Sequence, residues 1–122
     1  MDDRQRKEAG AGGESAALAH LLAQGLTLVE RNYRCRAGEL DLVMLDGKTL
    51  VLVEVRYRSN QDFGGAAASI TPRKQRRIAT AARHLLVTRQ ALRRYPARFD
   101  VIAITPGRDG ARIEWLKSAF TL

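Results

Sequence analysis

The sequence predicts an α/β fold in which a mixed β-sheet is flanked by helices. Two segments carry apolar residues at helical spacing, and five others carry the apolar and β-branched runs that are typical of strands. These segments follow one another as helix, three strands, helix and two strands, an order that places helices beside a sheet. At 122 residues the chain is long enough for one hydrophobic core, so we expect a single domain over residues 14–122.

The N-terminal part is expected to be a flexible tail followed by the first helix. Residues 1–13 are polar and end in a glycine-rich run, which disfavours ordered structure. Over Glu14–Gln24 apolar side chains recur at helical spacing, and Gly25 follows as a C-cap. Leu26–Arg34 is predicted as the first strand, and Arg36–Gly38 as a turn.

A β-hairpin is predicted around Asp46-Gly47, because Asp-Gly between two apolar runs is among the strongest hairpin signals. Glu39–Leu45 and Leu50–Tyr57 both have strand character on either side of it. With Asp46 and Gly47 as the two turn residues, Leu45 faces Lys48, and this fixes the register of the whole hairpin.

Three acidic side chains interrupt the apolar strands of this hairpin: Glu39, Asp41 and Glu54. In the predicted register Glu39 faces Glu54 and Asp41 faces Leu52. The three carboxylates then share one face of the sheet with Arg56, because side chains alternate along a strand. Asp41 and Glu54 become diagonal neighbours, about 7–8 Å apart by backbone.

Two explanations account for like charges held this close together. A hard divalent cation could lie between them, since Mg²⁺ takes one or two carboxylates, keeps several waters and accepts phosphate oxygens. Alternatively, the acids pair with the nearby arginines Arg34, Arg36 and Arg56. The spacing leaves both explanations open.

The second helix is predicted to begin at Thr71-Pro72, with threonine as the N-cap and proline in the first helical position. It ends before Tyr95-Pro96, and Phe99–Thr105 and Ala111–Lys117 are predicted as the last two strands. The apolar stripe of this helix comprises Ile78, Ala81, Ala82, Leu85 and Leu86.

The second helix also carries a positive charge that no acid opposes. Between Asp62 and Asp100 there are nine Lys and Arg residues and no acidic one, in a chain of net charge +8. Such a field favours a polyanion, so we expect nucleic acid as the partner, and an acidic protein is the alternative. The residues expected to contact nucleic acid are Arg73, Lys74, Arg76, Arg77 and Arg83.

Phosphate contact is favoured over base stacking, because aromatic residues near these cations are few, namely Tyr57, Phe63 and Tyr95.

No apolar run reaches the roughly 18–20 residues that cross a bilayer, and no apolar segment follows the charged N-terminus as in a secretory signal. We therefore expect a cytoplasmic protein without a membrane partner. The single cysteine, Cys35, excludes an internal disulfide and a thiolate metal site.

Five motifs follow one another along most of the chain: Gly13–Ala17, Arg31–Met44, Val51–Arg58, Thr71–Ile78 and Arg98–Ile104. Together they resemble the YraN family of small bacterial proteins. The family is predicted to be nuclease-like and is distantly similar to archaeal Holliday-junction resolvases. The resemblance implies the PD-(D/E)xK, restriction-endonuclease-like fold with an αβββαβ core, which agrees with the element order predicted above.

The resemblance implies a metal-dependent nuclease site. Asp41 takes the place of the motif's first acid and Glu54 of its second. These two, with the Val55 carbonyl, would hold Mg²⁺ or Mn²⁺, and Glu14 would help through water. Arg56 stands where the motif has a lysine, and this departs from the family pattern. An arginine stays charged, so it could stabilise the transition state but could not act as a base.

Lys74 could supply the missing lysine from the second helix, and Glu39 and Gln75 are assigned accessory places in the site. The expected substrate is DNA rather than RNA, either duplex or branched. Cutting two strands requires two sites, which favours a homodimer. The alternative is a catalytically weak or inactive nucleic-acid-binding module of the same fold, which Arg56 favours.

Overall fold

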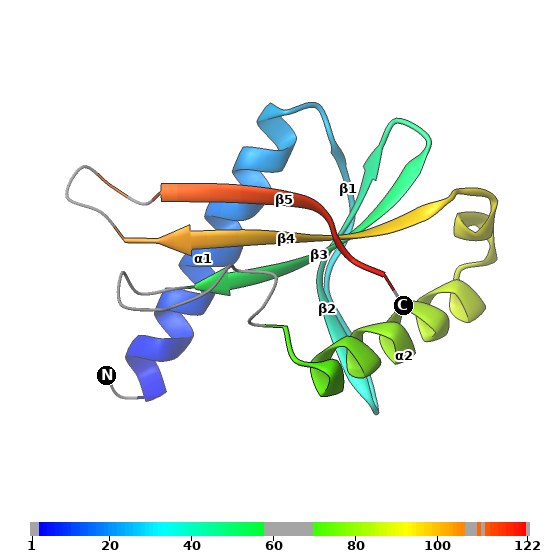
Figure 1. Cartoon of the computed structure of the whole chain (residues 1–122), viewed down its shortest axis with the longest axis horizontal. Helices are drawn as coiled ribbons and strands as arrows, with labels where there is room; N and C mark the ends of the chain where they lie inside the picture. The colour runs from blue at the N-terminus through cyan, green and yellow to red at the C-terminus, as the bar shows by residue number, and fades with distance from the viewer. Residues whose placement is uncertain (1–2, 58–69, 107–109, 111, 122) are drawn as a thin grey trace.

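The computed structural model describes residues 3–57, 70–106, 110 and 112–121, and of residues 3–12 the backbone alone. The predicted α/β class and element order are confirmed, with one short 3₁₀ helix added before the fourth strand. Along the chain the elements are α1 (Asp3–Ala23), β1 (Thr27–Cys35), β2 (Gly38–Asp46), β3 (Thr49–Tyr57), α2 (Pro72–Thr88), η2 (Gln90–Arg94), β4 (Ala97–Thr105) and β5 (Arg112–Phe120) (Figure 1).

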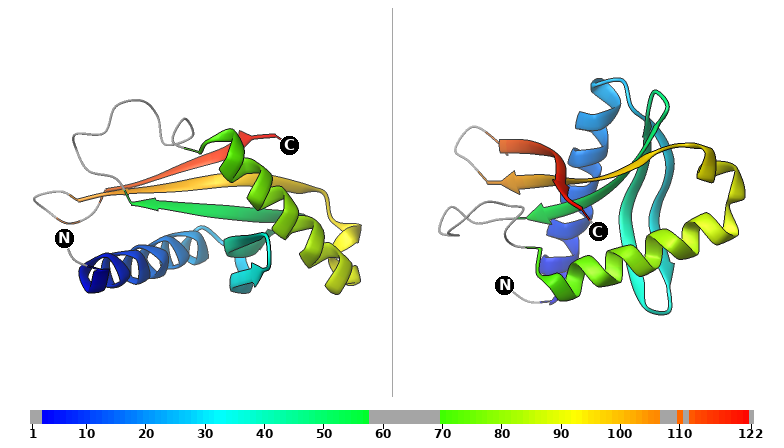
Figure 2. Two further views of the ribbon diagram at one scale, coloured as in Figure 1. Left: turned by 90° about the horizontal axis from the view of Figure 1, so that it is seen from below. Right: turned by 45° about the vertical axis from the view of Figure 1, so that its right-hand side comes forward.

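The strands form one mixed sheet in the order β1-β2-β3-β4-β5. β3 and β4 are parallel and are connected through α2, whereas the other neighbours are antiparallel. The helices cover opposite faces (Figure 2): Leu21 of α1 packs with Met44 and Val53, and Leu85 of α2 packs with Leu52. No helix among the described residues is both long and apolar enough to cross a membrane.

The hairpin between β2 and β3 is shifted by two residues from the predicted register, which was wrong. Asp46 pairs with Thr49, so Gly47 and Lys48 form the turn. Gly47 has φ +60°, which suits the first central position of a type II′ turn. Asp46 stays in the strand, where it accepts a 2.9 Å hydrogen bond from Arg98. Because the shift is even, the residues paired between Leu42–Asp46 of β2 and Thr49–Val53 of β3 keep their predicted faces.

β2 and β3 separate before either strand ends. Their pairing stops at Leu42 and Val53. Beyond these residues β2 pairs with β1 and β3 pairs with β4, and Figure 1 shows the two strands running apart. The separation forms a fork in the sheet, and its base is at Asp41 and Glu54, the residues that come next on each strand.

The N-terminal end of β2, which is not paired with β3, lies against α2 through a close backbone approach at Gly38. A Cβ added here would lie 2.0 Å from the carbonyl oxygen of Arg77 and 3.4 Å from the Cβ of Ala81. Real Cβ atoms do not approach a backbone oxygen this closely, so glycine is required. This contact directs β2 toward α2 as it leaves β3.

α2 begins as predicted. The Thr71 hydroxyl accepts a 3.1 Å hydrogen bond from the backbone N–H of Lys74, and Pro72 occupies the first turn. Of the predicted apolar stripe, Leu86 is half-buried and the other four residues are buried, together with Ala79.

α1 begins at Asp3 and not after the predicted tail, so the part of residues 1–13 that the structure describes is helical. Gly13 is buried, and a Cβ there would lie 3.4 Å from Tyr57 and 3.5 Å from Ile104. Because Gly13 already packs against the sheet, packing outweighs the low helix propensity of the glycine-rich run.

The C-terminus of α1 is a Schellman motif. The backbone N–H of Leu26 donates to the carbonyl of Leu21 (3.1 Å), and that of Gly25 donates to Leu22 (3.0 Å). Gly25 has φ +93°, so it is the left-handed residue that such a motif requires and confirms the predicted C-cap.

We expect Gly38→Ala to lower the free energy of unfolding by about 1–3 kcal/mol, because the added methyl group forces α2 and β2 apart. Gly13→Ala is the matched control. Its Cβ would make ordinary contacts at 3.4–3.5 Å, and alanine favours a helix by about 1 kcal/mol over glycine. Urea denaturation of both variants should give opposite signs; a neutral Gly38→Ala would contradict the close approach.

Candidate active site

Asp41 and Glu54 meet at the base of the fork. The Asp41 carboxylate accepts a 2.8 Å hydrogen bond from the backbone N–H of Val55. In a continuous ladder a strand carbonyl would accept from such an N–H, so the Asp41 side chain satisfies a donor that the separation of the strands exposes. Asp41 and Glu54 line the same pocket, and the negative charge of Asp41 raises the pKa of Glu54. The fork therefore brings the two carboxylates together.

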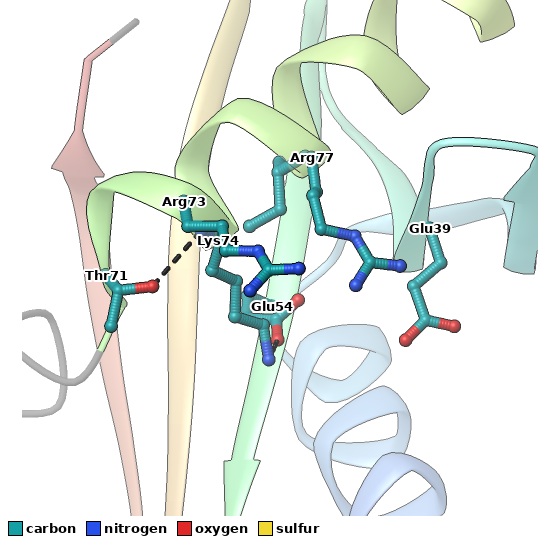
Figure 3. Close-up of a pocket in the computed structure, with 7 residues that line it drawn as sticks. Glu39, Glu54, Thr71, Arg73, Lys74 and Arg77 are labelled. Carbon is teal, nitrogen blue, oxygen red and sulfur yellow. Dashed lines mark hydrogen bonds and ion pairs between the residues drawn. The ribbon is translucent and has the colours of Figure 1, made fainter.

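Lys74 brings a positive charge to this pair from the first turns of α2. Its Nζ lies 2.6 Å from the nearer oxygen of Glu54, whose side chain is 7% exposed, while that of Lys74 is 37% exposed. Figure 3 shows Lys74 reaching from α2 to Glu54 on β3. The Thr71 N-cap and the crossover from β3 to β4 place this lysine, which lies 20 residues beyond Glu54 in the chain.

The protonation of the pair is governed by burial. Burial, together with the negative charge of Asp41, raises the pKa of Glu54 to about 7, although Lys74 opposes the shift. Burial also raises the pKa of Asp41, against the hydrogen bond from Val55. Glu14 of α1 extends the cluster, since burial and the charge of Asp41 both raise its pKa. Added positive charge would lower all three pKa values.

Two pockets adjoin the acid pair, and Glu39, Glu54 and Lys74 line both. The first has a volume of about 390 Å³ and lies beside α2. Arg73, Lys74 and Arg77 make it basic (Figure 3). We call it the basic pocket.

The second pocket has a volume of about 380 Å³ and lies beside α1 and β1. It exposes the acids together with an aromatic ring and an amide, so its chemistry differs from that of the basic pocket. We call it the acidic pocket. Besides the three shared residues it is lined by Gly13, Glu14, Asn32, Arg34, Asp41, Val55 and Tyr57.

Comparison with known proteins places the chain in a family. The model of the uncharacterised protein family UPF0102 matches residues 13–104. The chain belongs to the UPF0102 family. This is the YraN family that its motifs predicted.

Individual UPF0102 proteins are similar over almost the whole chain. A UPF0102 protein of Cupriavidus taiwanensis is 59% identical over 117 residues, which cover 94% of this chain and 84% of that protein. One from Saccharophagus degradans is 49% identical over 118 residues and 97% of each chain. One from Pseudomonas syringae is 50% identical over 122 residues and 98% of each chain.

The basic side chains predicted for the UPF0102 site separate into two groups. Lys74, Arg73 and Arg77 line the basic pocket, and Lys74 also lines the acidic pocket. Arg56 is half-buried on β3, and it is not among the described residues that line either pocket. The lysine of α2, Lys74, is therefore a cation at Glu54. The remaining predicted cations of α2, Arg76 and Arg83, are exposed.

Glu39 and Gln75, the two predicted accessory residues, have different surroundings from those of Asp41 and Glu54. Glu39 lies 3.5 Å from Arg34 and both side chains are largely exposed, so pairing with arginine accounts for this acid. The Gln75 amide donates a 3.1 Å hydrogen bond to the carbonyl of Ile70 and so supports the start of α2. Phe63, considered above as a stacking residue, lies outside the described residues.

Sequence reasoning did not place Asn32 in the site. Asn32 lies in β1 with φ +54°, a left-handed conformation that asparagine tolerates better than most residues. Its side chain hydrogen-bonds to Glu14 and lines the acidic pocket. An asparagine inside a predicted strand was the available signal, because this residue is depleted in strands.

The acid pair fits a hard divalent cation that substrate phosphate helps to hold. Among the described residues, no three His, Cys, Asp or Glu side chains are arranged to hold a metal ion by themselves. Asp41 and Glu54 provide two converging carboxylates whose pKa values are raised, chiefly by burial, which disfavours their charged forms in the absence of a cation. Two carboxylates plus phosphate oxygens and water are an ordinary ligand set for Mg²⁺.

Asp100 shows how a structural acid differs from this pair. It is 0% exposed, and it accepts hydrogen bonds from Arg98 (3.1 Å), Trp115 (2.9 Å) and the backbone N–H of Ser118 (2.9 Å). These bonds satisfy both oxygens and fasten β5 to β4. Asp100 is closed off from ligands, whereas Asp41 and Glu54 face a pocket.

We expect the stability of the protein in chelator to depend on pH through Glu54. Its pKa is about 7 when folded and about 4.5 when unfolded, so the folded state binds the proton more tightly. Proton binding by Glu54 therefore stabilises the folded state fully below about pH 4.5. This stabilisation is lost as pH rises through 7, which lowers the free energy of unfolding by about 1–3 kcal/mol.

Glu54→Gln removes this titration, so its stability relative to wild type should rise between pH 4.5 and 7.5. Urea denaturation across that range measures the difference. Glu114→Gln, on the exposed part of β5, is the control and should run parallel to wild type. A pH-independent effect of Glu54→Gln would contradict the raised pKa.

Proposed function

We propose that the protein is a metal-dependent nuclease that hydrolyses phosphodiester bonds of structured or duplex DNA. The observation that carries the proposal is the carboxylate pair at the fork, in which Glu54 is buried and Asp41 half-buried, with Lys74 at 2.6 Å from Glu54 and a basic pocket alongside. A carboxylate pair that repels itself favours a cation, and the adjoining basic residues favour a phosphate. Together they match the needs of phosphodiester hydrolysis more closely than those of a purely structural cluster.

Asp41 and Glu54 would hold Mg²⁺ or Mn²⁺, with the Val55 carbonyl as a further ligand and Glu14 acting through water. When bound, such an ion supplies a nucleophilic water of lowered pKa and polarises the phosphate. The Val55 N–H fixes the Asp41 carboxylate, so this ligand is held in one orientation before substrate arrives.

The cations around the pair would bind the phosphate and stabilise its transition-state charge. Lys74 lies at the boundary of the two pockets, where it can donate to a phosphate oxygen beside Glu54. Arg73 and Arg77 can bind the same or the neighbouring phosphate with planar donor pairs. Arg56 would add positive charge from β3, and the exposed Arg76 and Arg83 would contact the backbone farther along.

The second candidate is a nucleic-acid-binding module of the same fold with weak or no catalysis. Arg56 in place of the motif lysine favours it, because an arginine cannot accept a proton from water. The ion pair between Lys74 and Glu54 also favours it, since a neutralised acid has less need of a metal. A homodimer would follow from the nuclease proposal, because two strands require two sites.

We expect the wild-type protein to cleave at least one of three DNA substrates with Mg²⁺ or Mn²⁺: a four-way junction, a duplex and a single strand. Asp41→Ala should lower the rate by about 100-fold or more, a loss typical of removing one electrostatic group from a site. Glu114→Gln is the control outside the site. If wild type binds DNA but shows no cleavage that depends on Asp41, the binding module is the correct reading.

Binding of DNA in Ca²⁺ should weaken steeply as salt rises from 50 to 200 mM. Each lost phosphate contact lowers the slope of log K against log salt by about one, so the Arg76→Gln, Arg83→Gln double variant should lower it by about two. Arg112→Gln, on β5, serves as the control and should leave the slope unchanged. Equal slopes for all three proteins would remove Arg76 and Arg83 from the interface, whereas a wild type without salt-dependent DNA binding would favour an acidic protein partner.

A further inference from the structure

We propose that the acidic pocket binds one unpaired nucleobase against the ring of Tyr57. The preferred substrate would then carry an unpaired nucleotide next to the phosphate that is cut. This inference rests on the proposed nuclease function and names its substrate class: nucleic acid with a single-stranded end or branch, as opposed to continuous duplex.

The two pockets divide the functions that one nucleotide requires. The basic pocket presents Arg73, Lys74 and Arg77, which suit a phosphate. The acidic pocket presents a phenol ring and an amide, from Tyr57 and Asn32, which suit a base. Because Glu54 and Lys74 line both, a phosphate beside these residues has a base-binding surface on one side and a backbone-binding surface on the other.

Tyr57 has the surroundings of a stacking residue. It is 50% exposed, although it is a large aromatic side chain on a central strand. Its ring lies against Gly13 of α1, where a Cβ would approach to 3.4 Å. Part of the ring is thus supported by the helix, while the rest faces the pocket. A supported and half-exposed ring can stack a base of any sequence.

The acidic pocket can hold one nucleotide. Tyr57 lies three residues beyond Glu54, so the two side chains leave opposite faces of β3 and come together where this pocket opens at the fork. The intervening sugar of a nucleotide could connect a phosphate at Lys74 with a base at Tyr57. The pocket volume of about 380 Å³ lies within the range of small-ligand sites, about 300–1,000 Å³.

Only an unpaired base can take this place without breaking a base pair. A paired base is stacked inside the duplex, and turning it out costs a few kcal/mol, least when it is already single-stranded. The low number of aromatic residues in the chain favoured phosphate contact alone. One ring is sufficient, however, when it lies in the pocket that holds the acid pair.

The test measures binding without cleavage, in Ca²⁺, by fluorescence anisotropy on three DNA probes of the same duplex. The first is blunt, the second has a three-nucleotide single-stranded overhang, and the third has the same overhang with abasic sugars. The proteins are wild type, Tyr57→Ala, Tyr57→Phe and Leu28→Ala. Leu28 is an exposed apolar residue of β1 outside both pockets, and it controls for loss of surface area.

Wild type should bind the overhang more tightly than either other probe by roughly 5- to 100-fold, the range that stacking of one base supports. Tyr57→Ala should reduce binding of the overhang to that of the abasic probe and leave the blunt duplex unchanged. Tyr57→Phe and Leu28→Ala should keep the preference. A double-mutant cycle that combines Tyr57→Ala in the protein with removal of the base in the abasic probe isolates the binding energy of the contact between the ring and the base.

Three outcomes would overturn the inference. Tyr57→Ala could keep the overhang preference, it could weaken all three probes equally, or free dAMP could bind more tightly than the overhang, which would make this a mononucleotide site. If cleavage that depends on Asp41 persists in any of these cases, the nuclease proposal stands and the base pocket falls. Failure of wild type to bind any of the DNA probes would overturn both.

Discussion

The site depends on one constraint: β2 and β3 stop pairing while both strands continue. A paired strand has no room for a ligand between its neighbours, so the acids of an unbroken hairpin would face a helix or solvent. Separation after Leu42 and Val53 leaves a backbone donor without a ladder partner, and the Asp41 carboxylate binds it. The separation of the strands therefore creates the space, positions Asp41 and gives Glu54 access to the pockets. The pockets and the contact with Lys74 follow from this geometry.

Much of the fold could be predicted from local patterns. The order of elements, the Thr71 cap, the Gly25 end of α1 and the faces of the hairpin residues all follow from spacing within a few residues. The register error shows where such reasoning stops. The turn signal at Asp46-Gly47 was real, but a hydrogen bond from Arg98, 52 residues away, keeps Asp46 in the strand. Gly13, at the end of the glycine-rich run, likewise packs against Tyr57 of β3 and Ile104 of β4, which its sequence neighbours do not indicate.

The candidate site was predictable in its acids and less so in its cations. Alternation along the strands predicted Asp41 and Glu54 on one face, and in the structure both line the acidic pocket at the fork. The partner of Glu54 depends on where the crossover returns α2, which no periodicity specifies. Arg56 is close in sequence, whereas Lys74 is close in space. Asn32 and Tyr57 join the pocket for the same reason, since their contribution depends on the path of β1 and on α1 behind the ring.

Gly38 has a mechanical consequence for this arrangement. Its backbone touches that of Arg77 with no side chain between them to absorb movement. Arg77 lines the basic pocket, and Gly38 begins the strand that carries Asp41. The start of α2, which lines the basic pocket, and the start of β2, which leads to Asp41, are therefore packed backbone to backbone, and neither could shift alone without breaking this contact.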